Sequence, residues 1–257
     1  MTNKHPDVEN IILPVAGVAN WGSGNHSTAA VHFAPLRAYL QLKQHDVPVL
    51  SPLVPEGFGV LKTMKDTYQQ FEEDVERATD DYPNARILLV AHSLGGLLSR
   101  ELVGHDQTSS SRYIGAITLG SPHKDLPPTK YNLFSNRVRE MNKFADNVTT
   151  LWSRITKGPS LALVSARYDV VVPPRSALPP LSRASRYYLS DSSELPSELE
   201  GVTLVRTLPI DHFGLVLHPQ AIGFTSKLAS EMLEKSHASA RAPKQASRPI
   251  IRVYKTG

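Results

Sequence analysis

The chain contains no cysteine among its 257 residues. A disulfide framework, a cysteine nucleophile and a cysteine-based zinc site are therefore excluded. The chain also lacks an apolar run long enough to cross a bilayer, and its first ten residues are polar instead of forming a cleavable signal. We therefore expect a cytoplasmic protein, with export by a route that uses no cleaved signal left open.

Basic residues exceed acidic ones by only 28 to 24. The excess lies in the last stretch from Lys235 onward, which contains no acidic residue, so the rest of the chain is close to neutral. We expect one domain over residues 1–235 and a flexible basic tail over 236–257, with at most weak contact to an anionic surface. Nucleic-acid binding ranks last, because no aromatic residues are interleaved with the basic ones. The oligomeric state stays open.

Apolar runs typical of strands alternate with amphipathic stretches typical of helices. Parallel neighbouring strands need crossover helices, so this alternation favours an α/β fold with a mostly parallel, doubly wound sheet and helices on both faces. The predicted strands cover residues 9–15, 47–54, 87–90, 113–119, 160–165 and 202–208. The predicted helices start near residues 27, 64, 94, 133 and 221.

Ser93 stands between a buried strand and a helix. Ile87–Val90 is a continuous apolar run, and apolar residues follow Ser93 at helical spacing. The turn between them must be tight, so only small residues fit beside the serine, and Ala91 and Gly95 are small. This setting predicts a nucleophilic serine.

A second segment, Ile114–Lys124, ends in Gly-Ser-Pro-His. Together with Ala-His-Ser-Leu-Gly-Gly at 91–96, it resembles the α/β-hydrolase superfamily, and within it bacterial lipases and esterases. The resemblance extends from about Ile11 to Leu233. It implies a single-domain α/β-hydrolase fold and a serine hydrolase that cleaves carboxylic esters.

The resemblance also implies a chain order of serine, acid and histidine. Asp169 follows a buried strand and is the predicted acid, with Asp191 as the alternative. His212 follows the last predicted strand and is the predicted general acid/base, with His218 as the alternative.

The family stabilises the oxyanion of the tetrahedral intermediate with two backbone N–H groups. The first donor is predicted at Leu94, directly after the nucleophile. The second is predicted at Val18 after the first strand, with Ala16 and Ala19 as neighbours to consider. His92, beside the nucleophile, is expected to pack under the turn and to take no part in catalysis.

The amphipathic segment Leu133–Ile155 carries large apolar side chains on one side. We expect a helical cap over the substrate pocket at residues 131–156, and a plain sheet-covering helix is an equal alternative. The predicted pocket residues are Trp21, Phe58, Trp152 and Phe213.

These features predict hydrolysis of a small-molecule or lipid acyl ester through an acyl-serine intermediate, without a metal or organic cofactor. The remaining histidines lack a metal-ligand arrangement. An acyltransferase or thioesterase would use the same three residues, so both stay as alternatives. A non-catalytic binding module is a third alternative.

Overall fold

A computed structural model describes residues 4–17, 26–55, 63–106, 111–126, 135–155, 159–181 and 183–241. Within these ranges, parallel strands form one six-stranded sheet in which each strand pairs with the next along the chain. The strands are β1 (Asn10–Val15), β2 (Arg86–His92), β3 (Tyr113–Leu119), β4 (Ser160–Ala166), β5 (Ala184–Ser190) and β6 (Thr203–Arg206).

The order in which the chain adds strands to the sheet reverses at β1. Val49 and Leu53 form parallel bridges to β1 on the edge opposite β2. Helix α1 (His26–Lys43) leads to that edge, and α2 (Met64–Ala78) leads back to β2. This reversal confirms the predicted doubly wound α/β fold. In such sheets a crevice opens at the carboxyl ends of the strands where the order reverses.

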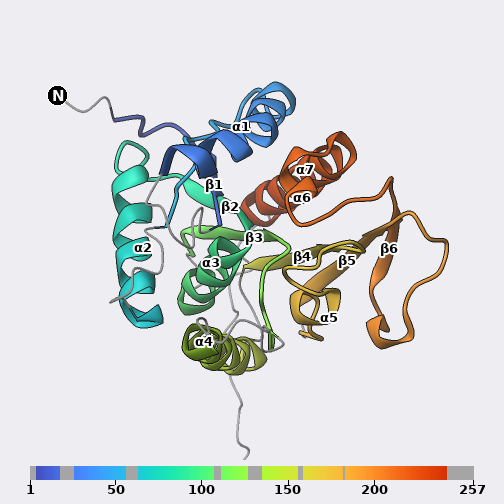
Figure 1. The fold of residues 1–257 in the computed structure, drawn as a ribbon. Coiled ribbons are helices and arrows are strands. Elements are labelled where there is room, and N and C mark those ends of the chain that lie inside the picture. The colour runs from blue at the N-terminus through green and yellow to red at the C-terminus, as the bar shows by residue number, and fades with distance from the viewer. Residues whose placement is uncertain are drawn as a thin grey trace, which may run out of the picture.

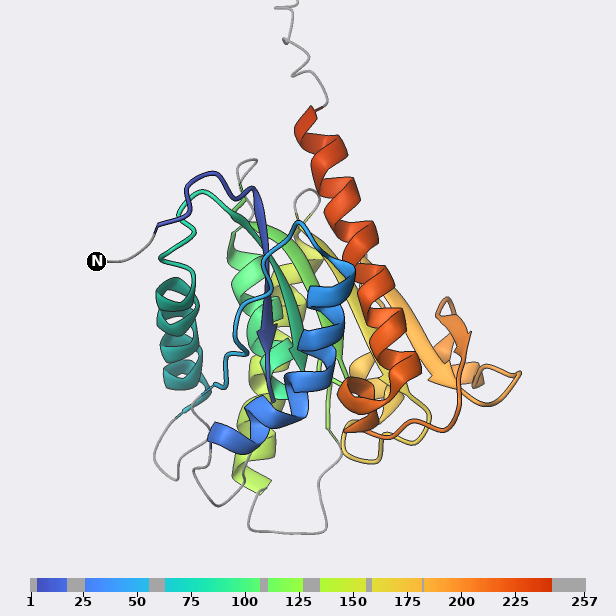
Figure 2. The same cartoon turned by 90° about the horizontal axis from the view of Figure 1, so that it is seen from above.

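Helices cover both faces of the sheet (Figures 1 and 2). Helix α1 packs with α6 (Gly214–Leu217) and α7 (Pro219–Arg241) on one face. On the other face lie α2, α3 (Leu94–His105) and α4 (Ser135–Ser153). The short helix α5 (Pro174–Ala177) follows β4, and a 3-10 turn, η2 (Ser197–Leu199), precedes β6.

The central strands are buried along nearly their whole length. Every residue of β1 and β3 is buried, and only the first residue of β2 and of β4 is not. Strands covered on both faces consist of continuous apolar runs, because neither face meets water. β6 lies at the edge of the sheet and is exposed or half-buried, and its sequence is accordingly more polar.

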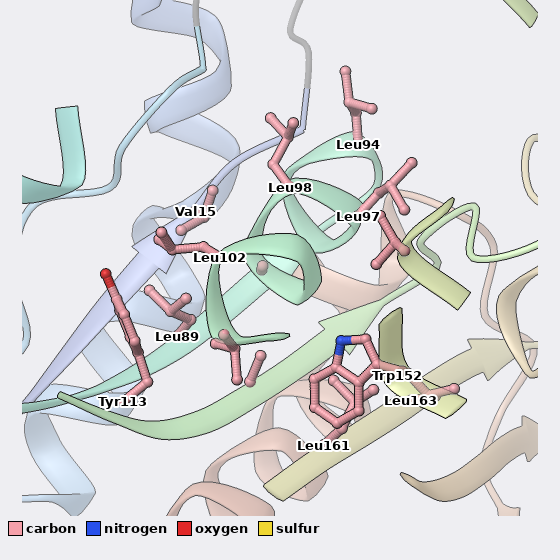
Figure 3. Packing of buried hydrophobic residues seen from close by; sticks show 14 of the residues in the cluster. Val15, Leu89, Leu94, Leu97, Leu98, Leu102, Tyr113, Trp152, Leu161 and Leu163 are labelled. Carbon is pink, nitrogen blue, oxygen red and sulfur yellow. The ribbon is translucent and has the colours of Figure 1, made fainter. Parts of the chain in front are cut away.

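Helix α4 is packed against α2 and α3 on its apolar side. Trp152 is 2% exposed, and its Nε1–H donates to the Arg100 carbonyl in α3 at 2.9 Å. Figure 3 shows its indole among the buried residues of this layer. The apolar face that we expected to open toward a substrate pocket is thus inside the core. The cap over residues 131–156 stays a prediction, and residues 131–134 and 156 lie outside the described ranges.

Helix α7 continues past the predicted domain end at residue 235 to Arg241. Ser236 is buried and accepts a hydrogen bond from the Arg86 side chain, and His237 lies 3.0 Å from Asn10 Nδ2. These contacts hold the start of the predicted tail against β1 and β2. In the described part of the chain, no helix combines the length and apolarity needed to cross a bilayer.

Trp152→Ala is expected to lower the free energy of unfolding by about 3–5 kcal/mol, because it removes a buried indole and leaves a cavity. The exposed neighbour Thr150→Ala is the control, with a change within about 0.5 kcal/mol. Urea unfolding followed by circular dichroism measures both. A stable Trp152→Ala variant with altered preference among ester chain lengths would instead support the cap.

Candidate active site

Ser93 occupies the turn between the end of β2 and the start of α3 with φ 53° and ψ −130°. It is the one non-glycine residue with positive φ among those described. Such a backbone costs on the order of 1–3 kcal/mol and persists only where neighbouring contacts enforce it. Here the Ser93 N–H donates to the Leu119 carbonyl at 2.9 Å, and the Ser93 carbonyl accepts from the Gly96 N–H at 3.1 Å.

The turn is enclosed by the end of β1. A Cβ atom on Gly95 would lie 2.5 Å from the Ala16 carbonyl oxygen, so no larger residue fits there. Ala91, on the other side of the serine, is fully buried. Gly17 lies directly against the Ser93 side chain, because a Cβ there would be 2.7 Å from Ser93 Cβ. The turn after β1 therefore lines the space around the nucleophile.

Asp169 and His212 form a buried pair. His212 Nδ1 lies 2.8 Å from Asp169 Oδ2, and the exposed fractions of the two residues are 5% and 3%. Asp169 Oδ1 also accepts from the backbone N–H groups of Val171 and Val172 at 3.1 and 2.7 Å. An ionised carboxylate can only accept, so His212 donates from Nδ1 and keeps Nε2 as a base.

Two loops bring this pair together. Tyr168 and Asp211 form a parallel bridge beyond the ends of β4 and β6, and the Tyr168 N–H donates to the Ile210 carbonyl at 3.3 Å. The next residue on each loop is Asp169 on one and His212 on the other. Asp211 accepts from the Gly214 N–H at 2.7 Å, which holds the histidine loop against the start of α6.

Gly120 joins the serine turn to the acid–base pair. It follows Leu119, whose carbonyl accepts from Ser93, and it has φ 55°. A Cβ at Gly120 would lie 2.7 Å from Asp169 Oδ2 and 3.1 Å from His212 Nδ1. Gly120 is therefore in contact with Asp169 and His212 and follows the residue that binds the Ser93 backbone, so the three predicted catalytic residues lie near the same edge of the sheet.

The Gly-Ser-Pro-His turn that begins at Gly120 is held by hydrogen bonds to α5 and α3. The His123 N–H donates to the Ser176 carbonyl at 3.0 Å, and Arg100 Nη1 donates to the His123 carbonyl at 3.1 Å. Burial lowers the pKa of Arg100 to about 9. Burial, with a smaller effect of the Arg100 charge, lowers the pKa of His123 well below its usual value. His123 is therefore a neutral ring, and its Nε2 lies 2.7 Å from the Thr118 hydroxyl.

Comparison with known proteins supports a hydrolase. The model of a family described as the PGAP1-like alpha/beta domain matches residues 60–172, which include Ser93 and Asp169 and end before His212. A GPI inositol-deacylase from Candida albicans is 26% identical over 164 residues, which are 63% of this chain and 34% of that protein. The chain thus spans about a third of the length of this curated relative.

Solved structures share the fold. A 2-hydroxy-6-oxo-6-phenylhexa-2,4-dienoate hydrolase from Rhodococcus sp. strain RHA1 has a TM-score of 0.55 at 12% identity, covering 89% of this chain and 92% of its own. Phospholipase PlaB from Legionella pneumophila has a TM-score of 0.58 at 14% identity, and the match covers 90% of this chain and 64% of the phospholipase chain. Together with the six-stranded parallel sheet, these likenesses show that the chain has an α/β-hydrolase fold.

The two alternative residues, Asp191 and His218, have partners other than Asp169 and His212. Asp191 is bound to Arg167 at 3.2 Å and accepts from the Tyr168 hydroxyl at 3.0 Å. His218 Nδ1 accepts from the Gln220 N–H at 3.3 Å at the start of α7. Both side chains already have local partners of their own, whereas Asp169 and His212 are bonded to each other.

The remaining predicted residues have different outcomes. Leu94 is the first residue of α3, where a backbone N–H has no acceptor within the helix. Phe213 is 51% exposed beside His212, with ring centroids 5.6 Å apart. Trp152 packs against Gly104, about ten residues or roughly 15 Å along α3 from Leu94, and so not next to Ser93. Val18, Ala19, Trp21 and Phe58 lie outside the described residues.

His92 makes a contact with His212 that the sequence did not predict. Its ring lies against that of His212, with centroids 4.4 Å apart. Its position directly before Ser93 was visible in the sequence, but its contact with a residue 120 positions away was not. Within the described ranges, no group of three or more His, Asp or Glu side chains is placed to hold a metal ion.

Gly120→Ala is expected to destabilise the protein by about 1–2 kcal/mol, because an alanine resists a left-handed backbone. Its methyl group would also press on the Asp169–His212 pair, so any ester hydrolysis that depends on this pair should fall roughly a hundredfold.

Gly223→Ala in α7 is the matched control. A Cβ there would lie 3.8 Å from the Tyr39 hydroxyl oxygen, which is an ordinary contact distance, so the methyl group fits. That variant should gain up to about 1 kcal/mol and keep its activity. Thermal unfolding and p-nitrophenyl ester turnover measure both variants, and equal behaviour of the two would refute the role given to Gly120.

Proposed function

We propose that this protein hydrolyses carboxylic esters through an acyl-serine intermediate, with Ser93 as nucleophile, His212 as general acid/base and Asp169 as the orienting acid. The observation that carries the proposal is the buried Asp169–His212 pair, which meets the strained Ser93 turn across Gly120. A hydroxyl is a weak nucleophile at neutral pH and needs such an adjacent base.

In the acylation step, Ser93 Oγ attacks the ester carbonyl carbon while His212 Nε2 takes the hydroxyl proton. The carbonyl π electrons move to the oxygen and form the tetrahedral intermediate. When this collapses, the bond to the leaving alkoxide oxygen breaks, and His212 returns the proton to release the alcohol. Asp169 stabilises the imidazolium that exists between these two transfers.

In the deacylation step, water replaces the serine as nucleophile. His212 takes one water proton, the oxygen attacks the acyl carbon, and Ser93 leaves with the proton, so that a carboxylic acid is released. The Leu94 N–H at the start of α3 is one proposed donor to the oxyanion. The second proposed donor, the Val18 N–H, belongs to a segment outside the described residues.

The name of the Candida albicans relative, a GPI inositol-deacylase, describes removal of an acyl group from the inositol of GPI. Together with the exposed Phe213 beside the base, this supports an acyl ester, of a lipid or a small molecule, as the substrate class. Acyl transfer to another acceptor would use the same intermediate. Product analysis with and without added alcohols separates hydrolysis from transfer.

Ser93→Ala should abolish turnover of p-nitrophenyl esters, with a loss on the order of a millionfold, and should abolish labelling by a fluorophosphonate probe. The exposed Ser153→Ala variant is the control and should keep both. Chelators should leave wild-type activity unchanged. Substantial turnover by Ser93→Ala would refute the proposed nucleophile.

His212→Ala should lose nearly as much activity as Ser93→Ala, whereas Asp169→Asn should lose roughly ten-thousandfold, because the amide favours the wrong tautomer of the imidazole. The matched controls are His218→Ala and Asp191→Asn, both of which should stay active. Steady-state kinetics on folded variants, checked by circular dichroism, decide the assignment. If His218→Ala is inactive and His212→Ala stays active, His218 is the base. If Asp191→Asn is inactive and Asp169→Asn stays active, Asp191 is the acid.

A further inference from the structure

His92 is a buried residue next to the proposed nucleophile in the chain and in contact with the proposed general base. It is the last residue of β2, its exposed fraction is 6%, and Ser93 follows it directly. His92 takes no part in the proton transfers proposed for Ser93 and His212. Its side chain nevertheless makes two contacts with His212, one through a ring nitrogen and one through the ring face.

The first contact is a hydrogen bond to the backbone. His92 Nε2 lies 2.9 Å from the His212 carbonyl oxygen. A carbonyl only accepts, so Nε2 carries the proton and donates. The bond ties the main chain of His212 to the end of β2, 120 residues earlier in the chain. The Asp169 carboxylate holds the same histidine by its side chain, so His212 is held at two points.

The second contact is between the rings. The two imidazoles are 4.4 Å apart at their centroids and inclined by 43°. The other groups that face His92 are the rings of Phe33 and Phe213, at 6.3 and 6.5 Å, and the titratable His32 of α1.

His92 stays neutral in this setting. Burial first, and then the positive charge of His212 when protonated, lower the pKa of His92 to about 3. The ring therefore adds no second positive charge beside the imidazolium that forms in each turnover.

We propose that His92 is a positioning residue: its Nε2–H holds the His212 backbone, and its ring packs against the His212 imidazole, so that His212 Nε2 stays directed at Ser93. This inference rests on the proposed function, because it assumes that His212 is the base. His92 itself touches no reacting atom.

Two variants separate the hydrogen bond from the space that the ring fills. His92→Gln keeps an N–H donor at nearly the position of Nε2, whereas His92→Leu has a similar size and no donor. We expect His92→Leu to lower kcat by roughly tenfold to a hundredfold, the cost of a misplaced catalytic group, with little change in KM. His92→Gln should recover most of this loss. Both variants should have similar melting temperatures.

A readout independent of substrate is the proton resonance of the hydrogen bond from His212 Nδ1 to Asp169, assigned by its loss in His212→Ala. It should persist in His92→Gln and be broadened or lost in His92→Leu. If the wild-type protein cleaves no ester, the proposed function fails, and this resonance still reports whether His92 orients His212.

Three results would overturn the proposal: unchanged kcat in His92→Leu, equal loss in His92→Leu and His92→Gln, or a rise in KM alone. If His92→Leu does not fold, His92→Phe takes its place, because it keeps an aromatic ring and lacks the donor. Should none of these variants fold, His92 is a requirement of the fold and the positioning role is rejected.

Discussion

The strained turn at Ser93 is the constraint on which the arrangement of the site depends. A serine with φ 53° cannot hold that backbone alone, and the contacts that hold it come from both neighbouring strands. β3 supplies the Leu119 carbonyl for the Ser93 N–H, and the end of β1 packs against Gly95. The position of the serine side chain is therefore set by the sheet. The same contacts place the start of α3 directly after Ser93, where the first N–H groups, such as that of Leu94, have no acceptor within the helix.

Asp169 and His212, the proposed acid and base, are positioned by a contact between two loops. Their loops follow β4 and β6, which are not neighbours in the sheet, and the Tyr168–Asp211 bridge closes the gap between them. Gly120 then lies against both side chains because it has no Cβ atom. The turn from Gly120 to His123 is held in turn by α5 and by the buried Arg100. A guanidinium without a carboxylate in contact is costly to bury, and here it is directed at a carbonyl at the base of the site.

Both buried histidines near the site are kept neutral by their surroundings. His92 and His123 each use a ring nitrogen to hold a polar neighbour, one the His212 carbonyl and the other the Thr118 hydroxyl. Burial lowers the pKa of both, so neither carries charge at neutral pH. In the proposed mechanism, the positive charge that forms on His212 would therefore have the Asp169 carboxylate as its counterpart among the described contacts. Two neutral imidazoles nearby add no positive charge that would oppose protonation of His212, which suits a general base.

Local patterns in the sequence indicated strands β1–β4 and β6, helices α1–α4 and α7, the fold class and the position of Ser93, because apolar periodicity and small residues around a turn act over a few residues. They did not indicate β5, and the strand predicted at residues 47–54 forms only isolated bridges to β1. The resemblance to α/β-hydrolases, with its chain order of serine, acid and histidine, also pointed to Asp169 and His212. Tertiary structure alone decided which carboxylate meets which histidine, since the pairing depends on a bridge between loops 43 residues apart. It also decided that Trp152 lies in the core, where one side of an amphipathic helix packs on α3, and that α7 continues to Arg241. The contact of His92 with His212 could likewise be found only in the tertiary structure. The two residues are 120 positions apart, and a local sequence pattern cannot predict a contact over that separation.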